Sequence, residues 1–346
     1  MKIITPKKFF LIITLLSSLI SIIIIPSVNY LIDPLQFFRE SKKNAHRLYQ
    51  SRYKHYQRIK YSNFDYLLMG TSMVNAFDEA YASKILNGNI VKLNMAGSST
   101  REQSLVIERA IKFNPRIKII WELTLHVFSL PSNYLPPEDI FPYWLYSETT
   151  AHDILFKYLS NMDTLKKSIK VLKMPKVKND QIIRNTAHET ALTPHVANVY
   201  LNRHKLMKKD IFPSDPRYLN DSYSKNILNL IKKYKNNEFI LFFSPQSIYY
   251  FLGYLYIWKD GKNKILSFKK NVMESSFKHK NLQLFDFQSN KKLISNLNNY
   301  IDPVHHNGKI AEYIIKSIKS NKKLVTIKNY NNLLNTFEAI LTERSD

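Results

Sequence analysis

The chain contains no cysteine, few glycines and few acidic residues. The lack of thiols excludes disulfides, thiolate metal sites and cysteine nucleophiles. Six glycines in 346 residues are well below the usual share of about 7%, so each remaining glycine is worth locating. Internal repeats, a P-loop, a Gly-x-Gly-x-x-Gly fingerprint and a Gly-x-Ser-x-Gly elbow are also missing. This argues against nucleotide binding by those motifs and against the α/β-hydrolase arrangement.

The shortage of acidic residues gives the chain a strong positive charge. Lysine and arginine number 51 against 27 aspartates and glutamates, for a formal charge of +24. Such an excess is typical of proteins that bind nucleic acid or anionic membranes. The lysines are, however, scattered among many Asn and Ile residues, as a genome poor in G and C would also produce, and no recognisable DNA- or RNA-reading motif accompanies them. We expect no nucleic-acid partner, and retain an attraction to anionic lipid or acidic polysaccharide.

The amino-terminal region contains a long run without charge. Residues 9–25 would form a helix of about 25 Å, and its continuation to residue 32 reaches the ~30 Å hydrocarbon core of a bilayer. The exit from this run offers no small-x-small cleavage site. We therefore expect an uncleaved transmembrane anchor over residues 9–32, with residues 1–8 as a basic cytoplasmic tip. The body would then lie on the extracytoplasmic or periplasmic side of the inner (cytoplasmic) membrane.

Residues 33–63 read as a juxtamembrane linker or helix whose basic face can rest on anionic headgroups, or simply as a solvated amphipathic helix. Positive charges flank the anchor on both sides, but long domains translocate largely regardless of charge. These flanking residues are Lys2, Lys7 and Lys8 before the anchor, and Arg39, Lys42, Lys43 and Arg47 after it.

Short apolar runs alternate with helical segments over residues 64–320. This alternation predicts an α/β fold with a flavodoxin-like doubly wound parallel sheet. It is lost over about 130–235, where a largely helical insertion is expected either as the wall of a site or as a purely structural excursion. Residues 321–346 form a C-terminal tail with one short helix. Expected strands are 66–70, 89–97, 117–124, 238–245 and 282–287, and expected helices are 77–86, 100–113, 224–234 and 308–318.

The first strand ends at Gly70 and presents Ser72 at its carboxyl end, where ligands bind in open α/β sheets. Taken alone, this stretch is more simply explained as a strand-to-helix turn in which the hydroxyl of Ser72 or Thr71 caps the helix. A nucleophilic serine needs a base and a group that orients the base. Asp302 and His305, three residues apart before the last helix, supply both. We expect a triad in which His305 activates Ser72 and Asp302 orients His305.

At these residues the chain resembles the SGNH, or GDSL-like, hydrolase superfamily. Residues 70–73 (Gly-Thr-Ser-Met) resemble the block that carries the nucleophile, and residues 302–305 (Asp-Pro-Val-His) resemble the Asp-x-x-His block. Residues 94–97 (Asn-Met-Ala-Gly) are similar to the block whose glycine amide serves the oxyanion. The resemblance implies an SGNH-type domain over residues 64–320. It also implies that the amides of Ser72 and Gly97 bind the oxyanion, with no cofactor.

One block departs from the family pattern. The family places an oxyanion-donating Asn after the third strand, whereas this chain has Glu122, which cannot donate when ionised. Thr124 or a residue of the insertion could support the site instead. We expect Asn94, Thr124 and Glu122 to line the site. Because one such donor is typically worth about 10² to 10³ in rate, slow activity and a degenerate, non-catalytic domain both stay open.

An anchor followed by such a domain is similar to the envelope subfamily that includes alginate O-acetylation and teichoic-acid D-alanylation proteins. This similarity implies an acyl esterase or O-acyltransferase that acts on an acylated glycan or polysaccharide of the cell envelope, beside a membrane-bound acyltransferase. The alternative is a non-catalytic scaffold, or a polysaccharide-binding assembly protein of the envelope.

Other candidate residues have simpler explanations. Ser98 and Ser99 could be nucleophiles, but a capping box at the start of the next helix, formed by Ser99 with Glu102 or by Thr100 with Gln103, explains them better. His306 competes with His305 as the base, and spacing favours His305. His126 follows a strand and either enters the cleft or is a structural histidine. The two adjacent histidines, with the aspartate before them, lack a fourth ligand, so we expect no metal.

Overall fold

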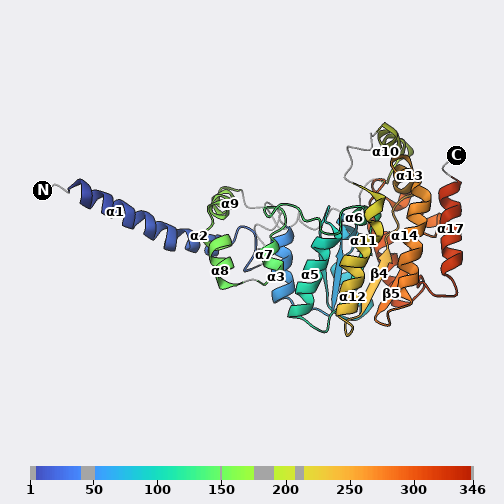
Figure 1. The fold of residues 1–346 in the computed structure, drawn as a ribbon, viewed down its shortest axis with the longest axis horizontal. Helices are drawn as coiled ribbons and strands as arrows, with labels where there is room; N and C mark the ends of the chain where they lie inside the picture. The colour runs from blue at the N-terminus through green and yellow to red at the C-terminus, as the bar shows by residue number, and fades with distance from the viewer. Residues whose placement is uncertain (1–4, 40–50, 149, 175–190, 207–213, 344–346) are drawn as a thin grey trace. The chain divides into compact units, whose positions relative to one another are not determined.

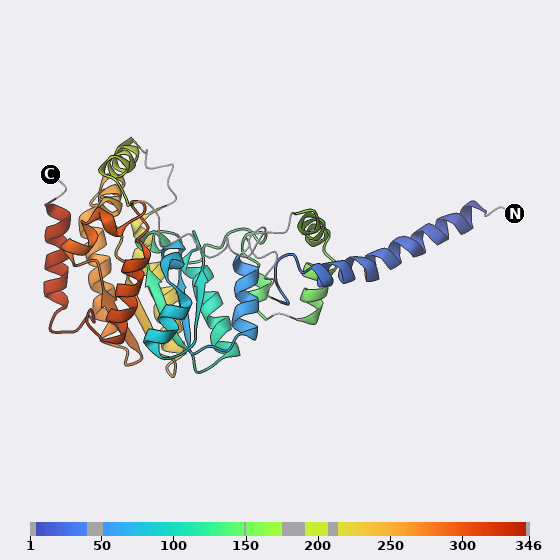
Figure 2. The ribbon, with the colours of Figure 1, turned by 180° about the vertical axis from the view of Figure 1, so that it is seen from behind.

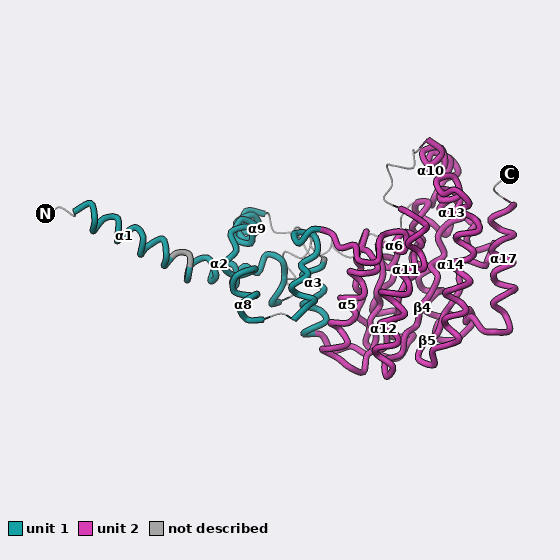
Figure 3. Tube along the Cα trace, in the orientation of Figure 1, with its two compact units in different colours: residues 1–61, 137–183 teal, residues 62–136, 184–346 magenta. Residues whose placement is uncertain are grey.

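The computed structural model describes residues 5–39, 51–148, 150–174, 191–206 and 214–343 (Figures 1 and 2). Contacts within the chain divide it into two compact units (Figure 3). Unit 1 comprises Met1–Tyr61 and Pro137–Ile183, and unit 2 comprises Ser62–Pro136 and Arg184–Asp346. The segment predicted as one insertion, 130–235, is thus shared between both units. Of the basic residues that flank the apolar run, Lys2, Lys42, Lys43 and Arg47 lie outside the described residues.

Unit 2 is built on a sheet of five parallel strands in the order β2-β1-β3-β4-β5. The predicted α/β class with a parallel sheet is therefore confirmed. In this order β2 lies on one side of β1, and β3, β4 and β5 follow on the other side. It is a common order for doubly wound sheets. It brings the carboxyl ends of β1, β2 and β3 to one edge. The strands are β1 (Tyr66–Gly70), β2 (Ile90–Asn94), β3 (Lys118–Leu123), β4 (Phe239–Phe243) and β5 (Leu282–Asp286).

Helices cover both faces of this sheet (Figures 1 and 2). Alternate strand residues point to opposite faces. Leu68, Ile120 and Phe242 therefore join α4 and α16 in one core cluster, while Trp121 points the other way and donates a hydrogen bond of 2.6 Å to Gln103 of α5. The helices of unit 2 include α4 (Glu79–Leu86), α5 (Thr100–Phe113), α6 (Leu125–Phe128), α10 (Pro194–Leu206), α11 (Leu219–Ser222), α12 (Asn229–Lys233), α13 (Ile248–Ile257), α14 (Gly261–Ser276), α15 (Lys291–Ile294), α16 (Gly308–Lys319) and α17 (Tyr330–Thr342).

Some of these helices follow the sequence prediction and others do not. The capping box of Ser99 with Glu102 is confirmed at the start of α5. Helices α13 and α14 were not predicted. Helix α13 is apolar almost throughout and has no helical period of polar residues. The C-terminal segment contains the expected short helix, α17, whose Phe337 and Leu341 are fully buried.

Unit 1 contains one long apolar helix over Pro6–Ile32, which is long and apolar enough to cross a membrane. It consists of α1 (Pro6–Leu19), one π-helical turn (Ile20–Ile24) and α2 (Ile25–Ile32). Beyond it, Asp33 accepts hydrogen bonds from the hydroxyl of Tyr158 at 2.6 Å and from the amide of Phe37 at 2.8 Å. The other helical segments of this unit are α3 (Ser51–Tyr61), α7 (Tyr143–Tyr146), α8 (Ala151–Asp153), η3 (Ile154–Leu159) and α9 (Met162–Lys173).

Candidate active site

Ser72 is the first residue of a single helical turn, η2 (Ser72–Ala76), directly after β1. The hydroxyl of Thr71 caps this turn by accepting the amide of Met73 at 3.3 Å. The capping interpretation of this stretch is thus correct for Thr71. It leaves the hydroxyl of Ser72, which is half-buried, to point away from the turn at the carboxyl edge of the sheet.

The structure brings Ser72, His305 and Asp302 together. The Oγ of Ser72 lies 2.7 Å from Nε2 of His305, across 233 residues of sequence. Nδ1 of the same ring lies 2.7 Å from Oδ2 of Asp302. The other carboxylate oxygen, Oδ1, accepts the amides of Val304 at 2.7 Å and His305 at 2.8 Å. This is the hydrogen-bond order in which an imidazole can take a proton from a hydroxyl while a carboxylate holds the ring.

Asp302 is held in its ionised form. Burial alone would raise its pKa, but the hydrogen bonds from the ring and amide of His305 and from the amide of Val304 outweigh burial and lower that pKa below its usual value. Because Oδ1 is committed to two amides, the carboxylate cannot easily rotate away from the ring. Asp302 is therefore positioned to fix the tautomer of His305 with the proton on Nδ1.

His306 does not take part in this arrangement. Its side chain is buried, packs edge-on against Phe77 and lies 3.1 Å through Nδ1 from the carbonyl of Asn307. Burial lowers the pKa of His306 to about 4. It is a neutral core side chain at pH 7, and the geometry selects His305 of the two neighbours.

Two amides next to Ser72 could bind an oxyanion. Gly97 and Ser72 line the same cavity, and Gly97 has a φ of 65°, a conformation that favours glycine. Within the described residues, neither the amide of Ser72 nor that of Gly97 donates a hydrogen bond to another protein group. Both therefore have the capacity to donate to a ligand.

Glu122 lies beneath the Ser72 turn and not among the residues that line the cavity. Its Oε2 accepts the amide and the hydroxyl of Thr71, both at 3.2 Å, and its Oε1 accepts the hydroxyl of Thr124. Gly70 makes room for it, since a Cβ at that position would lie 2.7 Å from the Cβ of Glu122. Burial raises the pKa of Glu122 to about 7, although the bonds from Thr71 act in the opposite direction.

Thr124 is the predicted residue that joins the cavity to a buried polar chain. It lines the cavity, and its hydroxyl accepts the side-chain amide of Gln246 at 3.2 Å. Gln246 in turn accepts from Gln288 at 3.2 Å, and Gln288 accepts from Lys269 at 3.0 Å. Lys269 also pairs with Asp286 at 2.7 Å, with both side chains almost fully buried.

The remaining predicted candidates have structural partners. Asn94 lies at the end of β2 and donates through Nδ2 to Asn75, and it does not line the cavity. The hydroxyl of Ser98 accepts from Gln103 at 2.8 Å, and Ser99 caps α5. Across the described ranges, no group of three or more His, Asp or Glu side chains is arranged to hold a metal ion.

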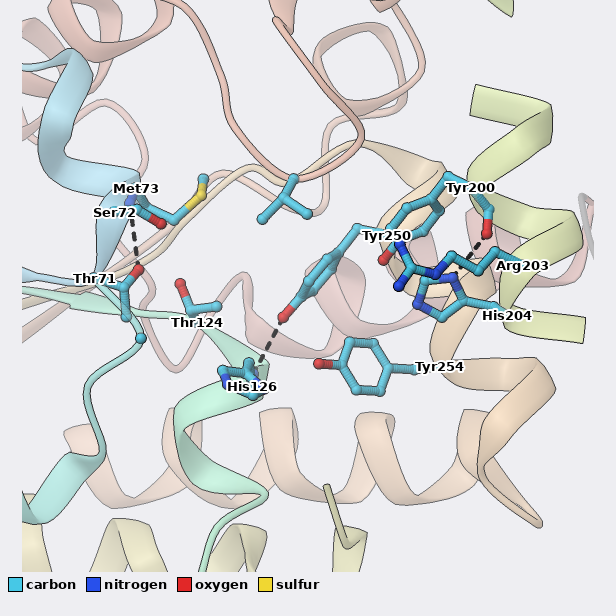
Figure 4. A pocket seen from close by; sticks show the side chains of 12 residues that line it. Thr71, Ser72, Met73, Thr124, His126, Tyr200, Arg203, His204, Tyr250 and Tyr254 are labelled. Carbon is cyan, nitrogen blue, oxygen red and sulfur yellow. Dashed lines mark hydrogen bonds between the residues drawn. The ribbon is translucent and has the colours of Figure 1, made fainter. Parts of the chain in front are cut away.

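The cavity at Ser72 has a volume of about 340 Å³. The individual residues of its far wall were not predicted, but α10 lies within the segment 130–235, for which the wall of a site was one of two expectations. Figure 4 shows Ser72 at one end and Tyr200, Arg203 and His204 of α10 at the other. Tyr250 and Tyr254 of α13 lie along the wall between them. The complete lining is Thr71, Ser72, Met73, Gly97, Thr124, His126, Tyr200, Arg203, His204, Tyr250, Tyr254 and Val304.

The wall is aromatic and internally bonded. His126 lines the cavity, and the hydroxyl of Tyr250 accepts its backbone amide at 3.1 Å. The ring of His204 packs on Tyr200 with centroids 4.0 Å apart. Burial lowers the pKa of His126 and raises the pKa of Tyr254 to about 12. At neutral pH the wall thus offers the neutral imidazole of His126 and the phenol of Tyr254, and the guanidinium of Arg203 adds a positive charge to the cavity lining.

No protein-family model matches the chain, and no curated protein matches its sequence.

Proposed function

We propose that the protein is a membrane-anchored, SGNH-like serine acyl esterase or O-acyltransferase that acts on a cell-envelope polysaccharide. The observation that carries this proposal is the uninterrupted chain from Ser72 through His305 to Asp302, with both links at 2.7 Å. Ser72, at one end of this hydrogen-bonded triad, lines a cavity that Gly97 also lines. The strand order and the position of Ser72 after β1 support an SGNH-type arrangement of the sheet.

The geometry supports acyl transfer in two steps. In the first, Oγ of Ser72 attacks the carbonyl carbon of an ester while its proton passes to Nε2 of His305. The oxyanion that forms accepts hydrogen bonds from the amides of Ser72 and Gly97. The C–O bond to the leaving alcohol then breaks, and the alkoxide takes the proton from His305. An acyl ester on Ser72 is left.

In the second step, His305 removes a proton from the acceptor, whose oxygen attacks the carbonyl carbon of the acyl ester. The bond from that carbon to Oγ of Ser72 then breaks, and His305 returns the proton to Oγ. Water as the acceptor gives hydrolysis, and a sugar hydroxyl gives transfer. The two outcomes share the same protein groups and differ only in which acceptor reaches the acyl ester. A membrane-bound acyltransferase that supplies or takes up the acyl group would be a natural partner for the transfer reaction.

The oxyanion site lacks a third donor from β3. Glu122 accepts three hydrogen bonds from Thr71 and Thr124 and offers none to the cavity. With two amides only, we expect a slow enzyme, because one missing donor costs about 10² to 10³ in rate. A slow enzyme is sufficient if the acceptor polymer is held at high local concentration beside the membrane.

The shape and position of the site support a glycan ester as the substrate. The cavity volume of about 340 Å³ falls at the lower end of the usual range for small-molecule sites. Its tyrosine wall offers flat apolar faces and hydroxyl groups, which suit a sugar ring. The apolar helix Pro6–Ile32 would anchor the protein, and an extracytoplasmic body would place the cavity beside envelope polymers.

The test compares full-length native protein with Ser72→Ala in detergent micelles. We expect native protein to release acetate from an acetylated sugar ester and to be labelled by a fluorophosphonate probe, and we expect Ser72→Ala to lose both signals. Ser267→Ala is the matched control, because Ser267 is an exposed residue of α14. Equal rates for native protein and Ser72→Ala would contradict catalysis and favour the non-catalytic, polysaccharide-binding scaffold.

A further inference from the structure

Helix α9 of unit 1 exposes its apolar side chains. Met162, Ile169 and Leu172 are 54%, 43% and 64% exposed, and Leu165 beside them is half-buried. Their spacing of three, four and three residues places them on one stripe of the helix. In a helix that packs on a water-soluble core, such a stripe faces inward. In α9 it faces outward.

The buried face of α9 is the more polar one, and hydrogen bonds fix it against α2. Thr164, Ser168 and Val171 form this face. The hydroxyl of Ser168 donates to Oδ1 of Asn29 at 2.9 Å, and Nδ2 of Asn29 donates to the carbonyl of Leu159 at 2.7 Å. These bonds prevent α9 from rolling over to bury its apolar stripe. The exposure of the apolar stripe is therefore fixed by the packing of unit 1.

The place where α9 packs on the long apolar helix corresponds to the edge of a bilayer. All described side chains of residues 6–24 are exposed, and the first buried ones are Ile25 and then Asn29. The uncharged residues 9–24 span about 24 Å at 1.5 Å per residue, so Lys7 and Lys8 at one end and the first turn of α2 at the other fit the two boundaries of a ~30 Å hydrocarbon core. If these residues cross a membrane, α2 emerges at the headgroups, and α9, bonded to Asn29, lies at the same depth.

The charges next to the apolar stripe fit the same surface. Helix α9 carries Lys166, Lys167, Lys170 and Lys173, of which Lys166 pairs with Asp163 at 3.0 Å. Lys170 and Lys173 are exposed. An apolar stripe bordered by lysines is typical of helices that lie in the membrane–water interface and favour anionic lipids.

We infer that α9 is an interfacial helix that inserts Met162, Ile169 and Leu172 among the acyl chains and places its lysines on anionic phospholipid headgroups. The exposed Leu155 and Phe156 of η3, which packs on the same α2, extend this surface. The contact gives unit 1 a second attachment to the bilayer besides its span. This inference rests on the apolar helix crossing the membrane and does not depend on catalysis.

The test uses the absence of native cysteine. Full-length Leu172→Cys, labelled with bimane, is reconstituted into vesicles that contain brominated acyl chains. We expect the lipid to quench most of the fluorescence, as it does for a probe at Leu16→Cys in α1. The matched control is Tyr61→Cys, an exposed position at the end of α3, which lies on the side of unit 1 away from α1 (Figure 3). Its fluorescence should be retained.

The lysines are tested by lipid composition. Quenching at Leu172→Cys should be stronger in vesicles with phosphatidylglycerol than in vesicles of phosphatidylcholine alone. A triple variant should remove this difference while the probe at Leu16→Cys stays quenched; it combines Lys167→Glu, Lys170→Glu and Lys173→Glu. Circular dichroism checks that the triple variant is folded. Quenching at residue 16 without quenching at residue 172 would overturn the inference, and so would an unquenched probe at residue 16. If the probe at residue 172 is protected from solvent in native membranes but not in the lipid vesicles, a protein partner covers the stripe, and the inference is overturned as well.

Discussion

Replacement of Glu122 by Gln should stabilise the protein at neutral pH and not at acidic pH. Burial raises the pKa of Glu122 from 4.5 to about 7, so the folded state binds a proton that the unfolded state has released between these two values. Stability from this group is therefore fully present below pH 4.5 and is lost as pH rises to about 7. At about 1.4 kcal/mol per pH unit, the loss amounts to about 3 kcal/mol.

The variant Glu122→Gln has the same shape and no charge. Its carbonyl oxygen can accept both bonds from Thr71. Its amide can donate to the hydroxyl of Thr124, which gives up Glu122 as its acceptor and turns its own proton toward the cavity that Thr124 lines. The free energy of unfolding of the variant, relative to native protein, should rise by about 3 kcal/mol between acidic and slightly alkaline pH.

Urea unfolding of the full-length protein in detergent measures this difference. Tryptophan fluorescence is a suitable signal, since Trp121 is fully buried next to Glu122 in β3. The control is Glu274→Gln on α14, where the carboxylate is 43% exposed and pairs with Lys270, and it should not change the pH dependence. A constant difference between Glu122→Gln and native protein at every pH would refute the reasoning, because it would mean that ionisation of Glu122 costs nothing.

Three further substitutions test individual contacts. Asp302→Asn keeps an oxygen for the amides of Val304 and His305 but presents an NH₂ group to the ring of His305. The rate of ester hydrolysis should therefore fall by about 10⁴-fold, with little change in melting temperature. A loss of only a few-fold would contradict the role of Asp302. Lys269→Met leaves the buried carboxylate of Asp286 without its cation and should reduce the free energy of unfolding by about 3–5 kcal/mol; urea unfolding of this variant at native stability would show that the pair is dispensable. Gly97→Ala should cost about 1 kcal/mol, because its φ of 65° disfavours a side chain while nothing lies within 4 Å of the added methyl, and an unchanged melting temperature would contradict this.

Much of the sheet domain could be predicted from local patterns. Short apolar runs marked all five strands, because a strand buried on both faces needs apolar side chains throughout. The box of Ser99 with Glu102 marked the start of α5, since both partners lie within one helical turn. Helix α13 escaped prediction because it is buried almost all round, which removes the polar face that a periodic pattern requires.

The sequence also indicated which residues could form a catalytic constellation, but only the tertiary structure decided their surroundings. Ser72 could be named because it follows the end of an apolar strand at Gly70, and His305 because it stands three residues after an aspartate just before the last predicted helix. A wall from the segment 130–235 was one of two expectations, but its residues Tyr200 and Arg203, and Tyr250 of α13, could not be named, because no local signal shows what these helices face. Glu122 likewise read as a departure from an oxyanion motif, and the fold places it as a buried acceptor under Thr71.

The amino-terminal region divides in the same way. Its apolar run is a property of consecutive residues, so composition and length alone established a helix able to cross a membrane. That η3 and α9 pack with this helix, and that α9 turns its apolar stripe outward, depends on contacts such as Ser168 with Asn29, which lie 139 residues apart. Local periodicity states that a helix has two different faces, and only long-range packing decides which of them is buried.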